Sequence, residues 1–248
     1  MASMQTLIGR LFRRAGATLR LFLLYFQDRR SYHLLRAVRR TGLTFLGLAA
    51  RLDLYDAVRR IEAQGAPGIL IEMGTALGGS ALVIAAAKPP ARKLLLYDVF
   101  GLIPPPSDHD GAIAQQRYAE ISRGAATGVG GTPYYGYRTD LLDAVKQSFT
   151  DYGFDLVADQ IGFVQGLYEE TLVVNEPVAL AHIDCDWYDS VMTCLQRIAP
   201  HLAPGGVLVI DDYYQWPGCK QAVDEYFAGR ENEFRFVRRA RLHIVRRP

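Results

Sequence analysis

Short apolar segments alternate with helical segments from residue 68 onward, and this alternation constrains the fold more than any other feature of the chain. Apolar runs typical of buried strands cover residues 68–73, 93–98, 161–165, 178–183 and 206–210. Helices are expected at 80–87 and at about 141–152, 188–202 and 217–228. Buried strands that alternate with helices predict a parallel, doubly wound α/β sheet. Two last runs, 234–237 and 242–245, predict an antiparallel hairpin.

The first 43 residues are expected to form a helical extension that precedes the main domain, residues 44–248. Residues 1–40 carry nine arginines and one acidic residue, Asp28, whereas the rest of the chain is mildly acidic. Residues 4–27 predict an amphipathic helix. Its apolar face holds Ile8, Leu11, Phe12, Ala15, Leu19 and Phe22, and its basic face holds Arg10, Arg13, Arg14 and Arg20. Further helices are expected at 31–41 and 44–64.

Two roles for this basic extension remain open at the level of sequence. Its apolar face can pack on the domain or on a second subunit, as a lid over a binding site. Alternatively, residues 1–30 can lie on an anionic membrane surface. We favour packing on protein, because an apolar stripe beside a large domain is more often buried than exposed. No run of 18 apolar residues exists, so no transmembrane helix is expected.

A glycine-rich turn follows the first expected strand, in Glu72-Met-Gly74-Thr75-Ala-Leu-Gly78-Gly79-Ser80. Glycines at a strand-to-helix turn let a ligand approach the backbone, and the helix N-terminal amides then face it. Ala76 stands where a dinucleotide fingerprint has its second glycine, so a pyrophosphate is disfavoured. Glu72 suits a ligand with an ammonium group. Asp98, at the end of the second strand, is placed to accept from ribose hydroxyls.

Acidic side chains follow the fourth and fifth parallel strands, as Asp184 and Asp186 after one and Asp211 and Asp212 after the other. Adjacent parallel strands bring their carboxyl ends together, where doubly wound sheets bind ligands. Carboxylates gathered at one crevice repel one another, and a cation stabilises them. Oxygen ligands select Mg²⁺ or a similar hard ion. The insertion at residues 99–140 is expected to act as a lid.

The remaining composition is ordinary for a globular protein. Three cysteines form no CxxC motif and cannot all pair, which favours a reducing compartment and a cytoplasmic location. No nucleic-acid partner is expected. His182 and the cysteines in apolar segments are interpreted as packing residues rather than catalysts.

The sequence resembles the macrocin O-methyltransferases (TylF/MycF type) from about Thr44 to Tyr226. The resemblance rests on the glycine turn and on three further blocks: Asp98-Val-Phe-Gly-Leu, Gln165-Gly166-Leu-Tyr-Glu-Glu-Thr-Leu and Asp184-Cys-Asp186-Trp-Tyr-Asp-Ser. It ends with Gly205-Gly206 and Asp211-Asp212-Tyr213. Five parallel strands followed by an antiparallel hairpin also match the outline of class I S-adenosylmethionine-dependent methyltransferases. The family carries an arginine where Leu77 stands here.

The resemblance implies a role for each site residue. Asp184, Asp211 and Asp212 are expected to ligate Mg²⁺, with Asp186 as the general base. The residues expected to hold S-adenosylmethionine are Glu72, Gly74, Thr75, Gly79, Ser80, Asp98, Gly166 and Asp184. The expected acceptor is a hydroxyl of a sugar or glycosylated natural product, and the chain is a candidate homo-oligomer.

Two other functions remain open. A catechol- or caffeoyl-type O-methyltransferase also uses a metal, because a vicinal diol chelates an ion whether it belongs to a sugar or to a catechol. A non-catalytic peripheral-membrane protein on the same fold is suggested by residues 4–27. The intact set of aspartates argues against this second alternative.

Overall fold

The computed structural model describes the backbone of residues 4–248 and the side chains of residues 15–248. Its centre is a seven-stranded sheet with the strand order β3-β2-β1-β4-β5-β7-β6. The parallel strands are β1 (Ile69–Met73), β2 (Leu94–Asp98), β3 (Ile161–Gln165), β4 (Val178–Ile183) and β5 (Leu202–Ile210). The hairpin of β6 (Phe234–Arg238) and β7 (Leu242–Arg246) adds two antiparallel strands beside β5. The expected doubly wound sheet with its antiparallel hairpin is therefore confirmed.

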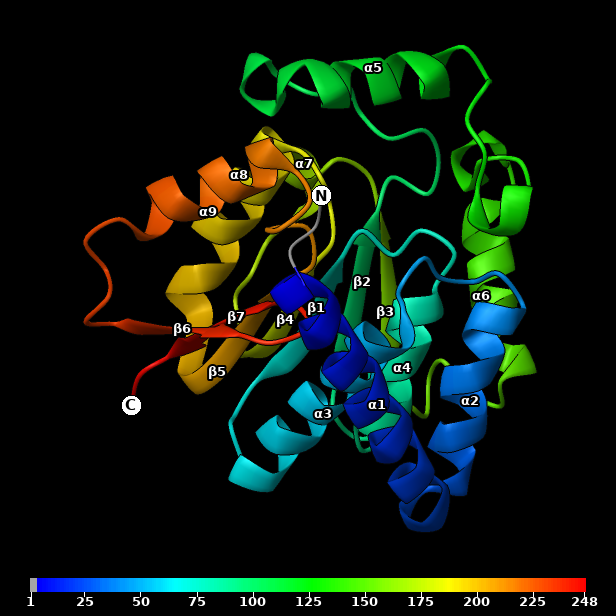
Figure 1. The fold of residues 1–248 in the computed structure, drawn as a ribbon, viewed down its shortest axis with the longest axis vertical. Helices are drawn as coiled ribbons and strands as arrows, with labels where there is room; N and C mark the ends of the chain where they lie inside the picture. Colours follow the sequence, from blue (N-terminus) through cyan, green and yellow to red (C-terminus); the bar gives the residue numbers. More distant parts are fainter. Residues whose placement is uncertain (1–3) are drawn as a thin grey trace.

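Helices cover both faces of the sheet (Figure 1). One face carries α1 (Met4–Gln27), α2 (Arg29–Arg40), α3 (Leu48–Gln64), α4 (Gly79–Ala87) and α6 (Leu141–Asp151). The other carries α7 (Tyr168–Thr171), α8 (Tyr188–Ile198) and α9 (Pro217–Phe227). Alternate residues of β1 point to opposite faces of the sheet. Leu70 packs into the hydrophobic core on the side of α3 and α4, and Ile71 packs into the core on the side of α8 and α9. Short 3₁₀ turns cover Asp108–Asp110, Val129–Gly131, Tyr135–Tyr137 and Ala199–His201.

The insertion between β2 and α6 lies over the carboxyl ends of the parallel strands, where Figure 1 shows α5 (Gly111–Ser122) crossing the top of the molecule. Asp110 anchors it. Its Oδ1 accepts from the amide of Tyr188 at 2.7 Å and its Oδ2 from the amide of Ser107 at 2.8 Å. The indole of Trp187 donates to the carbonyl of Pro104 at 3.0 Å. The start of α8, which follows Asp184 and Asp186 after the end of β4, thus holds the insertion over the sheet.

The N-terminal helix α1 packs on the domain through a different face from the expected one. Leu24 is buried, and Ala17 and Leu21 pack against the same core. Leu19 and Phe22, which belong to the predicted apolar face, are exposed, as is Ala15. The expectation that this face packs on the domain is therefore wrong for these three residues, because leucines on both sides of the helix allowed either choice. The remaining members of the predicted apolar and basic faces, apart from Arg20, lie outside the described side chains.

Candidate active site

The turn after β1 is shaped by close contacts with neighbouring strands. Gly74 has a φ of +87°, and a Cβ there would lie 1.8 Å from the carbonyl oxygen of Asp184. Only glycine satisfies both conditions. Ala76 also has a positive φ, +47°, and its amide donates to the Asp98 carboxylate at 2.8 Å. The turn is thus held between the ends of β2 and β4.

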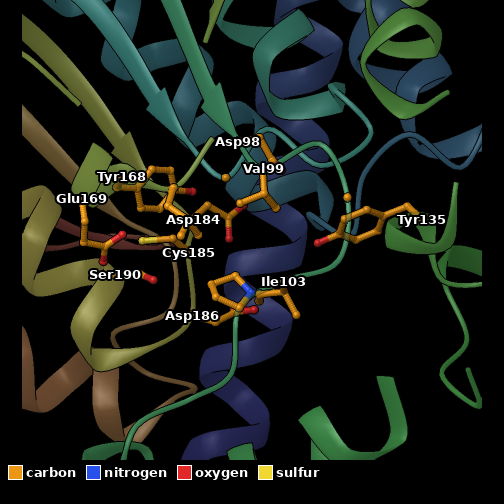
Figure 2. A pocket seen from close by; sticks show the side chains of 14 residues that line it. Asp98, Val99, Ile103, Tyr135, Tyr168, Glu169, Asp184, Cys185, Asp186 and Ser190 are labelled. Atoms are coloured by element: carbon orange, nitrogen blue, oxygen red, sulfur yellow. The ribbon is translucent and has the colours of Figure 1, made fainter. Parts of the chain in front are cut away.

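Asp98 fixes the end of β2 with both of its oxygens. Beside its bond to the turn, it accepts from the amide of Phe100 at 2.7 Å. Burial raises the pKa of Asp98, and the two amide bonds oppose that rise. Figure 2 shows Asp98 and Asp184 together on the wall of one cavity, with Tyr168 and Tyr135 on opposite sides of it. A carboxylate at this position has lone pairs left for ligand hydroxyls.

A buried ion pair lies beneath the turn. Glu72 is 0% exposed, and its Oε1 lies 2.9 Å from Nδ1 of His182. Burial alone would lower the pKa of His182, but hydrogen bonds to Asp211 and Glu72 raise it to about 10. The imidazolium then donates from Nδ1 to Glu72, and its Nε2 faces Oδ1 of Asp211. His182, which the sequence placed among the packing residues, therefore links the strand that bears the turn to the acids after β5.

Three carboxylates converge at the ends of β4 and β5. Asp184, Asp186 and Asp212, here called the acid cluster, each place an oxygen within 4.8 Å of the others. The backbone turns sharply to achieve this, since Asp186 has a φ of +59°, rare for a residue other than glycine. Burial first, and then the neighbouring carboxylates, raise the pKa values of Asp184 and Asp212 well above their usual range. Oδ2 of Asp212 is buried with no hydrogen-bond partner.

Asp211 is held differently from its neighbour. Its Oδ1 lies 2.5 Å from Nε of Arg241 and 3.6 Å from Nε2 of His182. Burial would raise the pKa of Asp211, but the hydrogen bond and charge of His182, together with the charge of Arg241, hold it below its usual value. Asp211 also lies in a second group with His182 and Asp184, but the protonated His182 has no nitrogen lone pair free for a metal ion. The structure thus divides the three predicted metal ligands between two groups that share Asp184.

Two cavities meet at the acid cluster. The narrow cavity in Figure 2 extends toward Asp98 and the β3–α7 loop. The wide cavity measures about 290 Å³, near the lower end of small-molecule sites. Both are lined by Gly74, Tyr135, Asp184 and Asp186. The wide cavity adds an aromatic wall and two cations, namely Phe45, Tyr134, Trp187, Trp216, Arg117 and Arg241.

The other predicted binding residues fall into two groups. Thr75 and Ser80 line the wide cavity, and Thr75 Oγ1 is buried without a partner. Gly79 and Gly166 line neither of the two cavities that meet at the acid cluster. Gly79 instead lies against the loop before α3, where a Cβ would be 2.4 Å from the carbonyl oxygen of Leu43. Gly166 donates its amide to the carbonyl of Asp98 at 3.0 Å, so it supports the end of β2.

Several lining residues were missed from the sequence. Arg117 and Tyr134 come from the insertion at residues 99–140. The sequence predicted that this insertion is a lid, but it did not indicate which of its side chains face the site. Arg241 lies in the arginine-rich bend of the terminal hairpin, and its position next to Asp211 depends on how that hairpin pairs with β5. A signal for Trp216 was available, because it follows shortly after the Asp211-Asp212 pair at the start of α9.

Comparison with known proteins identifies related sequences. The family model described as macrocin-O-methyltransferase (TylF) matches residues 26–234. A Streptomyces olivaceus relative, 8-demethyl-8-(2,3-dimethoxy-alpha-L-rhamnosyl)-tetracenomycin-C 4'-O-methyltransferase, is 31% identical over 189 residues, which span 74% of this chain and 67% of the relative. Mycinamicin III 3''-O-methyltransferase of Micromonospora griseorubida is 29% identical over 192 residues, or 74% of this chain and 69% of the relative.

Solved structures show the same fold. The O-methyltransferase NovP superposes with a TM-score of 0.67 at 22% identity, covering 95% of this chain and 99% of its own. A calicheamicin methyltransferase superposes with a TM-score of 0.63 at 20% identity, covering 94% of this chain and 91% of its own.

Proposed function

This chain belongs to the macrocin-O-methyltransferase (TylF) family, and we propose that it uses Mg²⁺ to methylate a hydroxyl of a sugar or glycosylated natural product. Its family and its named relatives make it an S-adenosylmethionine-dependent O-methyltransferase. The observation that carries the finer proposal is the acid cluster at the junction of the two cavities. A methyl donor in one cavity and an acceptor in the other would meet at those carboxylates.

We assign the donor to the side of the site that the narrow cavity and the glycine turn form. Asp98 would bind the ribose hydroxyls, and Tyr168 and Tyr135, which line the same cavity, would lie beside the base. The methionine end would then lie along Gly74 and Thr75, whose buried hydroxyl has no partner in the protein. Glu72 lies beneath this turn rather than on a cavity wall, and its carboxylate is paired with His182, so it would support the turn instead of contacting the donor.

A divalent metal ion fits the residues at the junction. The cluster offers only carboxylate oxygens, the donors that Mg²⁺ prefers. Burial first, and then mutual repulsion, raise the pKa values of Asp184 and Asp212, and Asp212 has a buried oxygen without a partner. Asp184 and Asp212 would hold the ion, with Asp211 completing the set if Arg241 releases it. When bound, the ion would lower the pKa of the acceptor hydroxyl.

Asp186 would take the proton from that hydroxyl. Methyl transfer forms a bond from the acceptor oxygen to the methyl carbon and breaks the bond from sulfur to that carbon. The proton passes to the Asp186 carboxylate, and the neutral thioether leaves. Burial raises the pKa of Asp186, which brings it closer to the operating pH and improves it as a base. The aromatic side chains of the wide cavity present flat apolar surfaces for the sugar faces.

The test combines a metal readout with a base variant. Excess EDTA should abolish methyl transfer to rhamnosylated acceptors, and Mg²⁺ should restore it. Asp186→Asn should lower kcat by about 10²–10⁴-fold, with the affinity for S-adenosylhomocysteine unchanged. Asp189→Asn is a matched control, because Asp189 is exposed and belongs to neither cavity. Full activity in EDTA would remove the metal from the mechanism, and faster turnover of simple catechols would favour the catechol-type alternative.

A further inference from the structure

Helix α1 exposes a row of large apolar side chains on its outer face. Leu19, Phe22, Leu23 and Phe26 are 60%, 58%, 45% and 69% exposed. Their spacing of three and four residues places them on one side of the helix, and we call them the apolar stripe. Leu24 on the opposite side is 1% exposed and holds α1 against the domain. The side chains of the apolar stripe therefore take no part in packing α1 against the domain.

Helix α2 exposes a row of basic side chains that follow one another at steps of three or four residues. Arg29, His33, Arg36 and Arg40 are all exposed, and we call them the basic stripe. Among residues 15–248, no acidic side chain forms a salt bridge with any of the four. Exposed arginines without acidic partners are available to an anionic surface.

The two stripes share one edge. Aromatic rings run from Phe22 to Phe26 and on through Tyr25 and Tyr32 to His33, with successive centroids 5.1–5.2 Å apart. The guanidinium of Arg29 lies over the ring of Tyr25 at 4.8 Å, and that of Arg36 over Tyr32 at 5.4 Å. Tyrosines therefore stand between an apolar row and a cationic row. This order of side chains suits the boundary between lipid chains and headgroups.

The positive charge of residues 1–40 favours an anionic partner for this surface over a second copy of the chain. Residues 1–40 contain nine arginines, and Asp28 is their one acid. Its carboxylate is already used, since it accepts from the amide of Ser31 at 2.9 Å and from the hydroxyl of Tyr55 at 3.1 Å. A second copy seated on the same surface would bring two cationic surfaces together, which opposes association. An anionic bilayer would neutralise the arginines while it buries the apolar stripe.

We propose that the apolar and basic stripes form a peripheral docking surface for an anionic phospholipid bilayer, with α1 lying in the interface plane. In the part of the chain that the structure describes, no helix is long and apolar enough to span a membrane. The surface would therefore bind the bilayer from one side, with the apolar stripe at the level of the acyl chains. This role is separate from methyl transfer and holds for any acceptor.

Vesicle sedimentation of the full chain tests the proposal. Vesicles of phosphatidylcholine with about 30% phosphatidylglycerol should bind the protein, and pure phosphatidylcholine should bind it far less. Phe22→Ser with Phe26→Ser should weaken binding at least about tenfold. An arginine near an anionic surface is worth about fivefold, so neutralising Arg29, Arg36 and Arg40 to Gln should weaken binding by about 100-fold.

A control pair distinguishes the stripe from general apolarity. Ile113→Ser with Val157→Ser alters side chains that are 69% and 88% exposed in other parts of the surface, and should leave vesicle binding unchanged. Thermal unfolding and S-adenosylhomocysteine binding should be equal in all variants, since every altered residue is exposed. Equal binding to neutral vesicles, or equal loss in the control pair, would overturn the proposal. So would light scattering that shows a dimer which the Phe22 and Phe26 changes dissociate.

Discussion

Replacing Asp212 with asparagine should make the metal-free protein more stable. Asp212 is 5% exposed, and its carboxylate lies within 4.8 Å of Asp184 and Asp186. Two unit charges at that distance repel by about 3–4 kcal/mol at an effective dielectric constant of about 20. Part of this repulsion is already relieved by proton uptake, so Asp212→Asn should gain about 1–3 kcal/mol. For a chain of this size, that gain corresponds to a rise in Tm of roughly 2–10 °C.

The assay is thermal unfolding of wild type and Asp212→Asn, each in EDTA and in excess Mg²⁺. Mg²⁺ should raise the Tm of the wild type, because a ligand that binds only the folded state stabilises it. The variant should start higher in EDTA and gain little from Mg²⁺. Asp143→Asn is the matched control, since the Asp143 side chain is 85% exposed. A variant that is less stable than wild type in EDTA, or that responds to Mg²⁺ as wild type does, would refute the reasoning.

Three further predictions follow from the same contacts. Asp98→Ala removes the acceptor for two backbone amides and should weaken S-adenosylhomocysteine binding by about 10–100-fold in calorimetry; unchanged affinity would place the ribose elsewhere. His182→Phe leaves the Glu72 carboxylate buried without a partner and should cost about 3 kcal/mol in urea unfolding; an unchanged midpoint would contradict the ion pair. The pKa values of Asp184 and Asp212 are raised in the folded protein, so the metal-free protein loses stability as the pH rises above the carboxyl pKa of the unfolded chain. The rise in Tm on adding Mg²⁺ should therefore be larger at pH 8 than at pH 5. A larger rise at pH 5 would contradict the raised pKa values.

The sheet could be predicted because its strands are continuous apolar runs. The segments 161–165 and 178–183 coincide with β3 and β4. The start of β5 was less accessible, because Pro204-Gly205 resembles a turn. In the structure the strand begins at Leu202, which pairs with Val178 across a shift in register. Tertiary pairing thus overrides a local turn signal.

The candidate site shows a similar limit. Acids after β4 and β5 had to lie close together because the two strands are parallel neighbours. Sequence could not tell which acids face one another. Asp186 joins Asp184 and Asp212 through a left-handed turn, whereas Asp211 turns toward Arg241, which is 30 residues away in the chain. Such contacts depend on the exact path of a turn and of a hairpin, neither of which leaves a periodic pattern.

The most direct test of the account is a calorimetric titration of the metal-stripped protein with Mg²⁺ in the presence of S-adenosylhomocysteine, comparing wild type with Asp184→Asn. Asp184 lies near both Asp211 and Asp212, so this variant tests the metal site whether or not Asp211 takes part in it. The account predicts one Mg²⁺ bound per wild-type chain and none by the variant, with the affinity for S-adenosylhomocysteine retained by both. Absence of Mg²⁺ binding to the wild type, or equal binding to the variant, would contradict the proposal that these aspartates hold a catalytic metal ion.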